Sequence, residues 1–469
     1  MSDGKKSTVP PQIQRKIDQI AKKALLDFKP TEKEMEIMTS YANQIMLRLK
    51  KVVPKDVEII SAGSVARGTQ LRGSSDIDIF LLFPKSVSPE QLRKKGLEYG
   101  KRIVQKRKNE SFMIKYAEHP YVQLLLSDMG IKADIVPARK ITDSKERVTA
   151  VDRTQLHNKY VNSHLTKKQR DDVITLKAFL KAHNIYGAQA KTEGFSGYLC
   201  ELLVSHWGSF ADVLANIARV NIPFALEPLI NREHHGKEAI IFARKFNSRF
   251  IVIDPTDSNR NVAAVVSDES LARFIIISKI MLSNPSAEFF YGAKHSEDYS
   301  ERKIASLRKE LGLNVYLLHF KVPEIAQDII WQQLKRLSKR LQDDLQKASF
   351  KPALTLENAE GTDAIIAFFI HDMEIKYEIA AGPTPYMGRA IEKFIGAHKK
   401  SLGVFLEKDR IMSIEESKYT VPEELLKDLL KKIDTPSYLE KKKMKMYKNA
   451  LPEPLAKLLY IAFVAKTNL

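Results

Sequence analysis

The chain has 469 residues, 44% of them hydrophobic and 28% charged, a composition typical of a globular protein rather than a disordered or fibrous one. Its 76 lysines and arginines exceed its 57 aspartates and glutamates, and the formal net charge of +19 favours a polyanionic partner such as a nucleic acid. The single cysteine, Cys200, excludes an intrachain disulfide and a cysteine zinc site; without an apolar run of membrane-spanning length or a signal-peptide pattern, we expect a cytoplasmic protein with no membrane partner.

Helices and strands alternate in the predicted structure of the first 150 or so residues. Thr31-x-x-Glu34 predicts a capping box at the start of the second helix. Strand-like runs follow at 57–60 and 80–83, and a helix opened by Ser88 interrupts the strands, with Ser at the N-cap and Pro at the first helical position.

Two carboxylates separated by one residue follow a Gly-Ser pair in the segment 61–80. In a strand, Asp76 and Asp78 lie on the same face. Their mutual repulsion is relieved by a hard divalent cation such as Mg2+, which prefers carboxylate and phosphate oxygens. Gly63 and Ser64 offer backbone N–H groups and a hydroxyl suited to a phosphate chain. The segment therefore favours a nucleotidyl-transfer site over a merely solvated strand edge.

A third carboxylate lies in a predicted hairpin formed by the apolar runs Tyr121–Leu126 and Ile131–Val136. Asp134 stands in the middle of the second run, where an unpaired charge would cost on the order of several kcal/mol. A buried salt bridge would explain Asp134 alone. A metal shared with Asp76 and Asp78 accounts for all three carboxylates.

Helical periodicity begins near residue 165, where Thr166 can cap a helix. By pattern alone, Lys177 beside its apolar stripe is a solvated or snorkelling lysine. A strand is predicted at 250–253, and a helix-like segment after Ser267. Two adjacent histidines in 232–236 lack zinc-ligand spacing and would point apart on any regular element, so we predict a loop there.

The last third mixes predicted strands at 314–319 and 364–370 with a helix at 325–348, an α+β arrangement compatible with a small RNA-binding sheet packed on helices. One short segment, either a solvated helix face or a phosphate-binding face, carries five lysines: Lys441, Lys442, Lys443, Lys445 and Lys448.

Several of these blocks together resemble a known family. Gly63-Ser64 followed by Asp76-x-Asp78 resembles the signature of the DNA polymerase beta nucleotidyltransferase superfamily. The fuller pattern is similar to the archaeal, class I CCA-adding enzymes (tRNA nucleotidyltransferases). The matching blocks are Gly-Ser-x-Ala-Arg-Gly-Thr at 63–69, Tyr-Ala-Glu-His-Pro-Tyr at 116–121, Asp-Ile-Val-Pro at 134–137, Ala-Val-Asp-Arg-Thr at 150–154, Gly-Phe-Ser-Gly-Tyr-Leu-Cys-Glu-Leu-Leu at 194–203, Asp-Pro-x-Asp at 254–257 and Arg-Asn-Val-Ala-Ala at 260–264. The C-terminal region matches little by motif.

The resemblance implies roles for particular residues. Asp76 and Asp78 would hold two Mg2+ ions, and Asp134 would help to hold the catalytic one; some members have Glu where this chain has Asp76, and both are oxygen ligands. The implied nucleotide contacts are Ser64 and Arg67 at the phosphates, Lys177 and Tyr186 at the triphosphate with His157 near it, Arg260 at the base edge, and His119 and Pro120 bordering the nucleotide or primer pocket.

The expected fold is α+β and multidomain, and the chain length also predicts about three domains. The resemblance implies a polymerase-beta-like nucleotidyltransferase catalytic domain at 1–153, a mostly helical central nucleotide-binding domain at 154–283, and an α+β C-terminal RNA-binding region at 284–469.

The implied activity is the addition of C, C and A to the 3′ end of tRNA from CTP and ATP, without a nucleic acid template and with release of diphosphate. A poly(A) polymerase or another terminal nucleotidyltransferase on RNA would use the same carboxylates. A catalytically inactive RNA-binding protein is a further alternative. The expected partners are tRNA, CTP and ATP, and a homodimer is considered.

Overall fold

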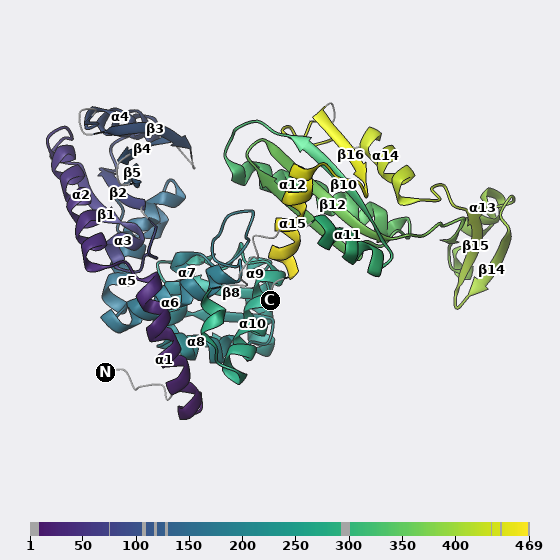
Figure 1. Ribbon diagram of the computed structural model, residues 1–469, viewed down its shortest axis with the longest axis horizontal. Helices are drawn as coiled ribbons and strands as arrows, with labels where there is room; N and C mark the ends of the chain where they lie inside the picture. The colour runs from purple at the N-terminus through teal and green to yellow at the C-terminus, as the bar shows by residue number, and fades with distance from the viewer. Residues whose placement is uncertain are drawn as a thin grey trace. The chain divides into compact units, whose positions relative to one another are not determined.

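The computed structural model describes residues 9–74, 76–105, 109–116, 120–126, 130–291, 301–432, 434–440 and 443–467. The chain forms two compact units, one reaching residue 294 and the other spanning 295–468. Figure 1 shows their helices and strands.

The first unit contains both sheet-forming and helical segments. Its elements are, in chain order, α1 (Pro11–Phe28), α2 (Glu32–Lys50), β1 (Glu58–Ala62), α3 (Gly63–Arg67), β2 (Asp76–Phe83), α4 (Pro89–Arg102), β3 (Glu110–Tyr116), β4 (Pro120–Leu126), β5 (Ile131–Arg139), α5 (Thr154–His164), α6 (Lys167–Ala182), α7 (Gly197–Trp207), α8 (Phe210–Ile217), β6 (Phe224–Glu227), β7 (Arg232–His234), α9 (Gly236–Phe246), β8 (Phe250–Asp254), β9 (Asp257–Asn261) and α10 (Asp268–Ser283).

Side-chain caps begin three of these helices where the sequence predicts them. The Thr31 hydroxyl accepts a hydrogen bond from the Glu34 backbone N–H, and the Glu34 carboxylate accepts one from Thr31 N–H, which completes a capping box on α2. Ser88 caps α4 and Thr166 caps α6 with the same reciprocal geometry. The three predicted helix starts are confirmed.

A five-stranded sheet in the order β1-β2-β5-β4-β3 carries the predicted carboxylates. Strands β2 and β5 run parallel, and the other neighbours are antiparallel. Helices α2 and α4 pack on one face of this sheet, over the apolar side chains of β2, β4 and β5. A Cβ at Gly96 of α4 would lie 2.5 Å from the Pro137 Cβ of β5, so only glycine permits this close approach. The carboxylates lie on the other face.

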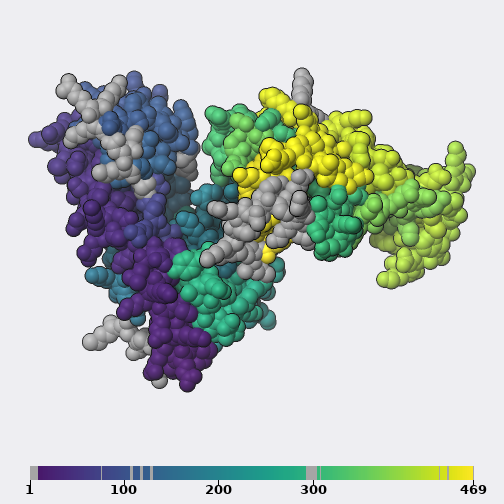
Figure 2. All heavy atoms as spheres, viewed as in Figure 1, coloured from purple at the N-terminus to yellow at the C-terminus, as the bar shows by residue number. Residues whose placement is uncertain are grey.

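Helices α5 to α8 and α10 form the second part of the first unit, around a core rich in phenylalanine. Helix α1 contributes Ile17 and Ala24 to that core, whereas α2 packs on the five-stranded sheet. Atoms of both helices line one side of the unit (Figure 2). A four-stranded sheet in the order β7-β6-β8-β9 accompanies the helices.

The second unit combines two sheets with helices. Its elements are α11 (Glu301–Glu310), β10 (Leu313–Lys321), α12 (Gln327–Lys347), β11 (Leu354–Glu360), β12 (Asp363–His371), β13 (Tyr377–Ala381), α13 (Arg389–Ala397), β14 (Gly403–Glu407), β15 (Arg410–Glu416), α14 (Pro422–Lys432), β16 (Met444–Lys448) and α15 (Glu453–Thr467). The sheets have the orders β11-β12-β10-β16 and β13-β15-β14.

The structure excludes one alternative for the lysine-rich segment and contradicts the loop predicted at 232–236. The lysine-rich segment is not a helix in its described part, because Met444–Lys448 pairs with β10 as strand β16. Residues Arg232–His234 are not a loop but strand β7, which pairs with β6. In both cases the partner strand supplies backbone hydrogen bonds that local sequence does not reveal.

Candidate active site

Strands β2 and β5 place two of the three predicted carboxylates side by side. Asp78 is the register partner of Asp134 in the parallel ladder, and Asp76 precedes Asp78 by two residues on the same face. Burial, followed by the negative charge of Asp134, raises the pKa of Asp78 to about 7, and Arg67 opposes the shift only in part. Burial also raises the pKa of Asp134. The sheet thus holds two carboxylates where ionisation of both is unfavourable.

Neighbours on strand β4 hold the Asp134 side chain. The Gln123 amide donates a hydrogen bond to Asp134 Oδ1 at 2.8 Å. The Tyr121 hydroxyl also interacts with this carboxylate, and burial together with the Asp134 charge raises the pKa of Tyr121 to about 12. The hydrogen bond from Gln123 therefore fixes one oxygen of Asp134, and the charge of this carboxylate interacts with the charges of Asp76 and Asp78.

The Gly-Ser turn lies directly against Asp78. Gly63 has φ +72°, and a Cβ on it would lie 1.8 Å from Asp78 Oδ2, so both the backbone conformation and the space require glycine. Ser64, next in the short helix α3, accepts a backbone hydrogen bond from Thr69 at 3.0 Å. The predicted phosphate-binding turn and the predicted carboxylate face thus come together.

The donor chemistry of this face suits a hard divalent cation. Among the residues that the structure describes, no three His, Cys, Asp or Glu side chains converge as a ready-made metal site. Carboxylate oxygens are nevertheless the ligands that such cations prefer, and burial together with repulsion from neighbouring carboxylates raises the pKa values of Asp78 and Asp134, which a cation would oppose. The residues present therefore fit a divalent metal.

A buried ion network lies behind the turn, around the fully buried carboxylate of Glu201 on α7. Its Oε1 accepts hydrogen bonds from Arg67 Nε at 3.1 Å and from the Thr69 hydroxyl at 2.5 Å, and lies 3.6 Å from Lys177 Nζ. The Lys177 amine also donates to the Thr69 carbonyl at 2.9 Å, and its side chain is only 1% exposed. The interpretation of Lys177 as a solvated or snorkelling lysine is therefore wrong.

The charges in this network stabilise one another. Burial opposes ionisation of Glu201, but Lys177 and Arg67 outweigh it and lower the carboxyl pKa. Burial lowers the pKa of Lys177, and Glu201 opposes that shift. Tyr186 lies beside the amine, since a Cβ on Gly197 would be 3.3 Å from both the Tyr186 hydroxyl and Lys177 Nζ. Three of the predicted nucleotide-binding residues, Arg67, Lys177 and Tyr186, are thus neighbours.

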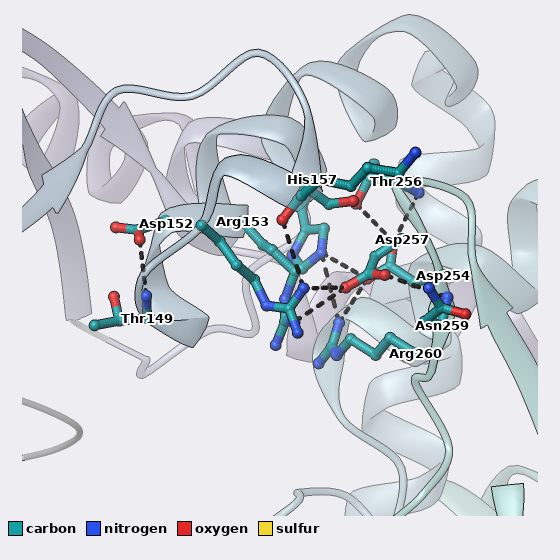
Figure 3. Close-up of polar contacts among 12 residues, drawn as sticks. Thr149, Asp152, Arg153, His157, Asp254, Thr256, Asp257, Asn259 and Arg260 are labelled. Carbon is teal, nitrogen blue, oxygen red and sulfur yellow. Dashed lines mark hydrogen bonds and ion pairs between the residues drawn. The ribbon is translucent and has the colours of Figure 1, made fainter. Parts of the chain in front are cut away.

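A second network centres on Asp254, at the end of β8 (Figure 3). Asp254 Oδ2 lies 2.8 Å from His157 Nε2 and accepts a hydrogen bond from Arg260 at 2.7 Å. Asp254 Oδ1 accepts hydrogen bonds from the Tyr198 hydroxyl and from both the backbone and the hydroxyl of Thr256. Burial disfavours the carboxylate, but these partners hold the pKa of Asp254 well below its usual value.

His157 belongs to the network of Asp254 and is also affected by the charge of Arg67. Its ring stacks on Tyr198 with centroids 4.0 Å apart. Burial lowers the pKa of His157, Asp254 opposes the shift, and the charges of both Arg260 and Arg67 add to it. The structure therefore brings His157 and Arg260 together, as predicted for residues of one nucleotide pocket.

The other predicted contacts are only partly described. Pro120 begins β4, and His119 lies outside the described residues, as do Lys441 and Lys442. Lys443 pairs with Glu440 at 3.0 Å, and Lys448 lies 3.8 Å from Glu423 and over the Tyr316 ring. In strand β16, Lys445 and Lys448 point to opposite faces, so the described lysines do not form a single face.

Sequence reasoning missed Glu201, Asp254, Tyr198 and Thr69 as members of the site. Glu201 carried a usable signal, because a carboxylate inside an apolar helical run needs a partner just as Asp134 does.

His234 contacts Glu227 at 2.7 Å and Glu238 at 3.0 Å and is buried, whereas His235 is exposed. The two histidines do point apart, as expected.

In the part of the chain that the structure describes, no helix is long and apolar enough to cross a membrane.

Comparisons with known proteins match three stretches of this chain. The family described as "Nucleotidyltransferase domain" matches residues 42–157, "tRNA nucleotidyltransferase, second domain" matches 171–291, and "CCA-adding enzyme, C-terminal domain" matches 311–437. The expected α+β multidomain fold with a nucleotidyltransferase domain is confirmed.

Three relatives, each named "CCA-adding enzyme", resemble the chain over most of its length. The one from Archaeoglobus fulgidus is 34% identical over 87% of this chain and 88% of its own. That from Methanocaldococcus jannaschii is 35% identical over 90% and 94%, and that from Sulfurisphaera tokodaii is 35% identical over 87% and 91%.

Proposed function

Because this chain belongs to the family of CCA-adding enzymes, we propose that it adds C, C and A to the 3′ end of tRNA from CTP and ATP and releases diphosphate. The observation that carries the proposal is the register of β2 and β5, which places Asp78 beside Asp134 and against the Gly63 turn. Nucleotidyl transfer needs such an arrangement, because one site must accommodate both the attacking hydroxyl and the triphosphate.

Enzymes with this domain generally use divalent metal ions. In our proposal the metal is Mg2+, held by Asp76, Asp78 and Asp134; when bound, it supplies charge that lowers the pKa of the RNA 3′-hydroxyl and offsets the charge of the leaving diphosphate. Asp78 must be ionised to act as a ligand. Its raised pKa makes metal affinity increase with pH up to about 7.

The remaining residues bind and orient the nucleotide. Ser64 and the turn at Gly63 receive the phosphates beside the carboxylates. Arg67, Lys177 and Tyr186 provide positive charge and a hydroxyl behind the turn, with the two cations held in place by Glu201. His119 and Pro120 border the nucleotide or primer pocket.

Base selection is assigned to the network around Asp254. His157 lies near the triphosphate, and Arg260 is oriented by Asp254 and presents planar donors to the acceptors of cytosine or adenine. Without a nucleic acid template, this edge recognition has to distinguish CTP and ATP from UTP and GTP.

The second unit is assigned to binding tRNA through phosphates, with Lys441, Lys442, Lys443, Lys445 and Lys448 among the contacts. The domain boundaries at 153 and 283, a cytoplasmic location and a homodimer remain predictions.

The experiment uses tRNA transcripts that end before the CCA, after the first C and after the second C, each incubated with Mg2+ and labelled CTP or ATP. We expect incorporation to stop after two C and one A. The Asp78→Asn variant should bind the same transcripts but not extend them.

Each competing function gives its own result in this assay. Continued addition of A, or extension of unrelated RNA, would identify a poly(A) polymerase or a general terminal nucleotidyltransferase. Transcript binding by the unaltered protein without any turnover would identify an inactive RNA-binding protein.

A further inference from the structure

Three arginines, Arg147, Arg153 and Arg260, lie close together near Asp254 and Asp257. Arg147 and Arg153 each bring a guanidinium nitrogen to 3.2 Å from the same oxygen, Asp257 Oδ2. Figure 3 shows the labelled Arg153 and Arg260 directed toward Asp257 and Asp254. The cluster therefore joins the loop before α5 to strand β9.

Positive charge exceeds negative charge in this cluster. The Asp257 carboxylate serves two guanidinium groups, and its other oxygen accepts the Asn259 backbone N–H at 3.2 Å. Asp254 cannot supply the missing charge, because it already accepts hydrogen bonds from Tyr198, Thr256 and Arg260 and contacts His157. Three guanidinium groups thus share two carboxylates.

Burial makes this excess costly in the absence of an anion. The side chain of Arg153 is 11% exposed, and among the described residues its buried Nε has no hydrogen-bond partner. Burial, then the charges of Arg260 and Arg147, lower the pKa of Arg153. The side chains of Arg147 and Arg260 are 41% and 32% exposed, so an anion from solution can reach them.

We propose that Arg147 and Arg153 form a binding site for a phosphate group beside Arg260, and that a backbone phosphate near the 3′ end of the RNA substrate occupies it. The choice of RNA rests on the proposed function, in which the nucleotide's own phosphates lie beside Asp78 and Ser64. Guanidinium groups suit phosphate through paired N–H donors.

The test compares Arg147→Gln with Arg232→Gln. Arg147 is partly exposed and its removal leaves Asp257 paired with Arg153, so the variant should fold; thermal unfolding checks this. Arg232 is an exposed arginine with an acidic partner, Glu238, and serves as the matched control. A second variant, Arg153→Lys, keeps the charge but removes the paired donors.

Two affinities are measured for each protein: that for a tRNA transcript lacking CCA, over a series of salt concentrations, and that for CTP with inorganic diphosphate as competitor. We expect Arg147→Gln to weaken transcript binding about tenfold. The log–log salt slope should fall by about 0.7–0.9, with CTP affinity unchanged. Arg153→Lys should weaken transcript binding in the same direction, and Arg232→Gln should change neither affinity.

The outcomes separate the sources of the phosphate. Weakened binding of CTP and diphosphate with unchanged transcript affinity would support a phosphate site whose ligand is the nucleotide. If Arg147→Gln and Arg153→Lys leave every affinity unaltered, the arginines serve only Asp257 and the inference is overturned. Failure of the unaltered protein to incorporate CTP would reject the proposed function, whereas the phosphate site is judged by binding alone.

Discussion

The surroundings of the Asp78 carboxyl group disfavour its ionisation. Ile77 and Ile79 anchor its strand in the core behind the sheet, while Asp134 lies beside it and Gly63 against it. Its pKa is therefore about 7, above the value of 3.8 expected without these neighbours. Between pH 3.8 and about pH 7, the Asp78 carboxyl group keeps its proton in the folded protein but has released it in the unfolded chain. This group's contribution to stability accordingly decreases as pH rises through that range.

We predict that Asp78→Asn stabilises the metal-free protein in a pH-dependent way. Near pH 4 the protonated acid and the amide are alike, so the unfolding free energies of variant and unaltered protein should agree. Their difference should grow toward pH 7, to a few kcal/mol at about 1.4 kcal/mol per unit of pKa shift. Urea unfolding in a chelator at several pH values measures it, with the exposed Asp56→Asn as control. A difference that stays constant across this range would contradict the assigned environment.

The buried Glu201 should be a major contributor to stability, because Arg67 and Lys177 share its charge. Glu201→Gln leaves two cations without a counter-charge and should cost about 3–5 kcal/mol in unfolding free energy. Thr69→Val removes a hydroxyl that donates to the same oxygen and accepts from Lys177, and should cost about 2 kcal/mol. Urea denaturation compares the two, and equal decreases would show that the Glu201 charge is unimportant.

Nucleotide discrimination should depend on Arg260 and on the carboxylate that orients it. Arg260→Ala should weaken the use of CTP and ATP by roughly 1–3 kcal/mol and increase incorporation of UTP and GTP. Asp254→Asn should act in the same direction, because the amide lacks the charge that holds Arg260. Single-nucleotide incorporation assays measure both, with the exposed Arg249→Ala as control. Unchanged misincorporation would remove Arg260 from base selection.

Helix α6 shows how a local signal supports the site. Its start was predictable, because the Thr166 hydroxyl satisfies the Gln169 backbone N–H within four residues of sequence. The burial of Lys177 was not predictable from the sequence, because its amine contacts Thr69 and Glu201, which lie far from it along the chain. The cap therefore begins a helix whose buried lysine is oriented by tertiary packing.

We predict that Thr166→Ala lowers the unfolding free energy by about 1 kcal/mol, because the variant lacks the side-chain acceptor for the first turn of α6. Thr166→Ser retains the hydroxyl and should lie close to the unaltered protein. Thermal or urea unfolding followed by circular dichroism gives both values. Equal stability of the Ala and Ser variants would mean that the cap contributes nothing.

At the scale of the whole molecule, the net charge of +19 predicts that RNA binding is strongly salt-dependent. The described lysines of the C-terminal cluster lie on both sides of strand β16, and two of them contact Glu440 and Glu423. Their contributions to RNA binding should therefore be unequal, with Lys445 the largest.

Replacing Lys443, Lys445 and Lys448 together by Ser should weaken tRNA binding and leave CTP affinity unchanged. The log–log salt slope should decrease by about 0.7–0.9 for every lysine that binds an RNA phosphate in the unaltered protein. The matched control replaces Lys16, Lys22 and Lys23, exposed lysines of α1, and changes net charge equally. If both triple variants show the same slope, the effect is one of total charge and not of RNA binding by β16.

The sequence by itself determined the features that depend on neighbouring residues. Capping side chains and turn residues act within a few positions, so the starts of α2, α4 and α6 followed from local chemistry. Strand alternation likewise placed Asp76 and Asp78 on one face, and an isolated carboxylate in an apolar run identified Asp134.

Only the tertiary structure decided which distant groups meet. Glu201 reaches Arg67 across 134 positions, and Asp254 reaches His157 across 97, so no local pattern could pair them. Strand β16 forms because β10 offers it an edge, which excludes the solvated-helix alternative for the described part of the lysine-rich segment. Packing brings such segments together, and because burial removes water, it also determines which charges must be paired.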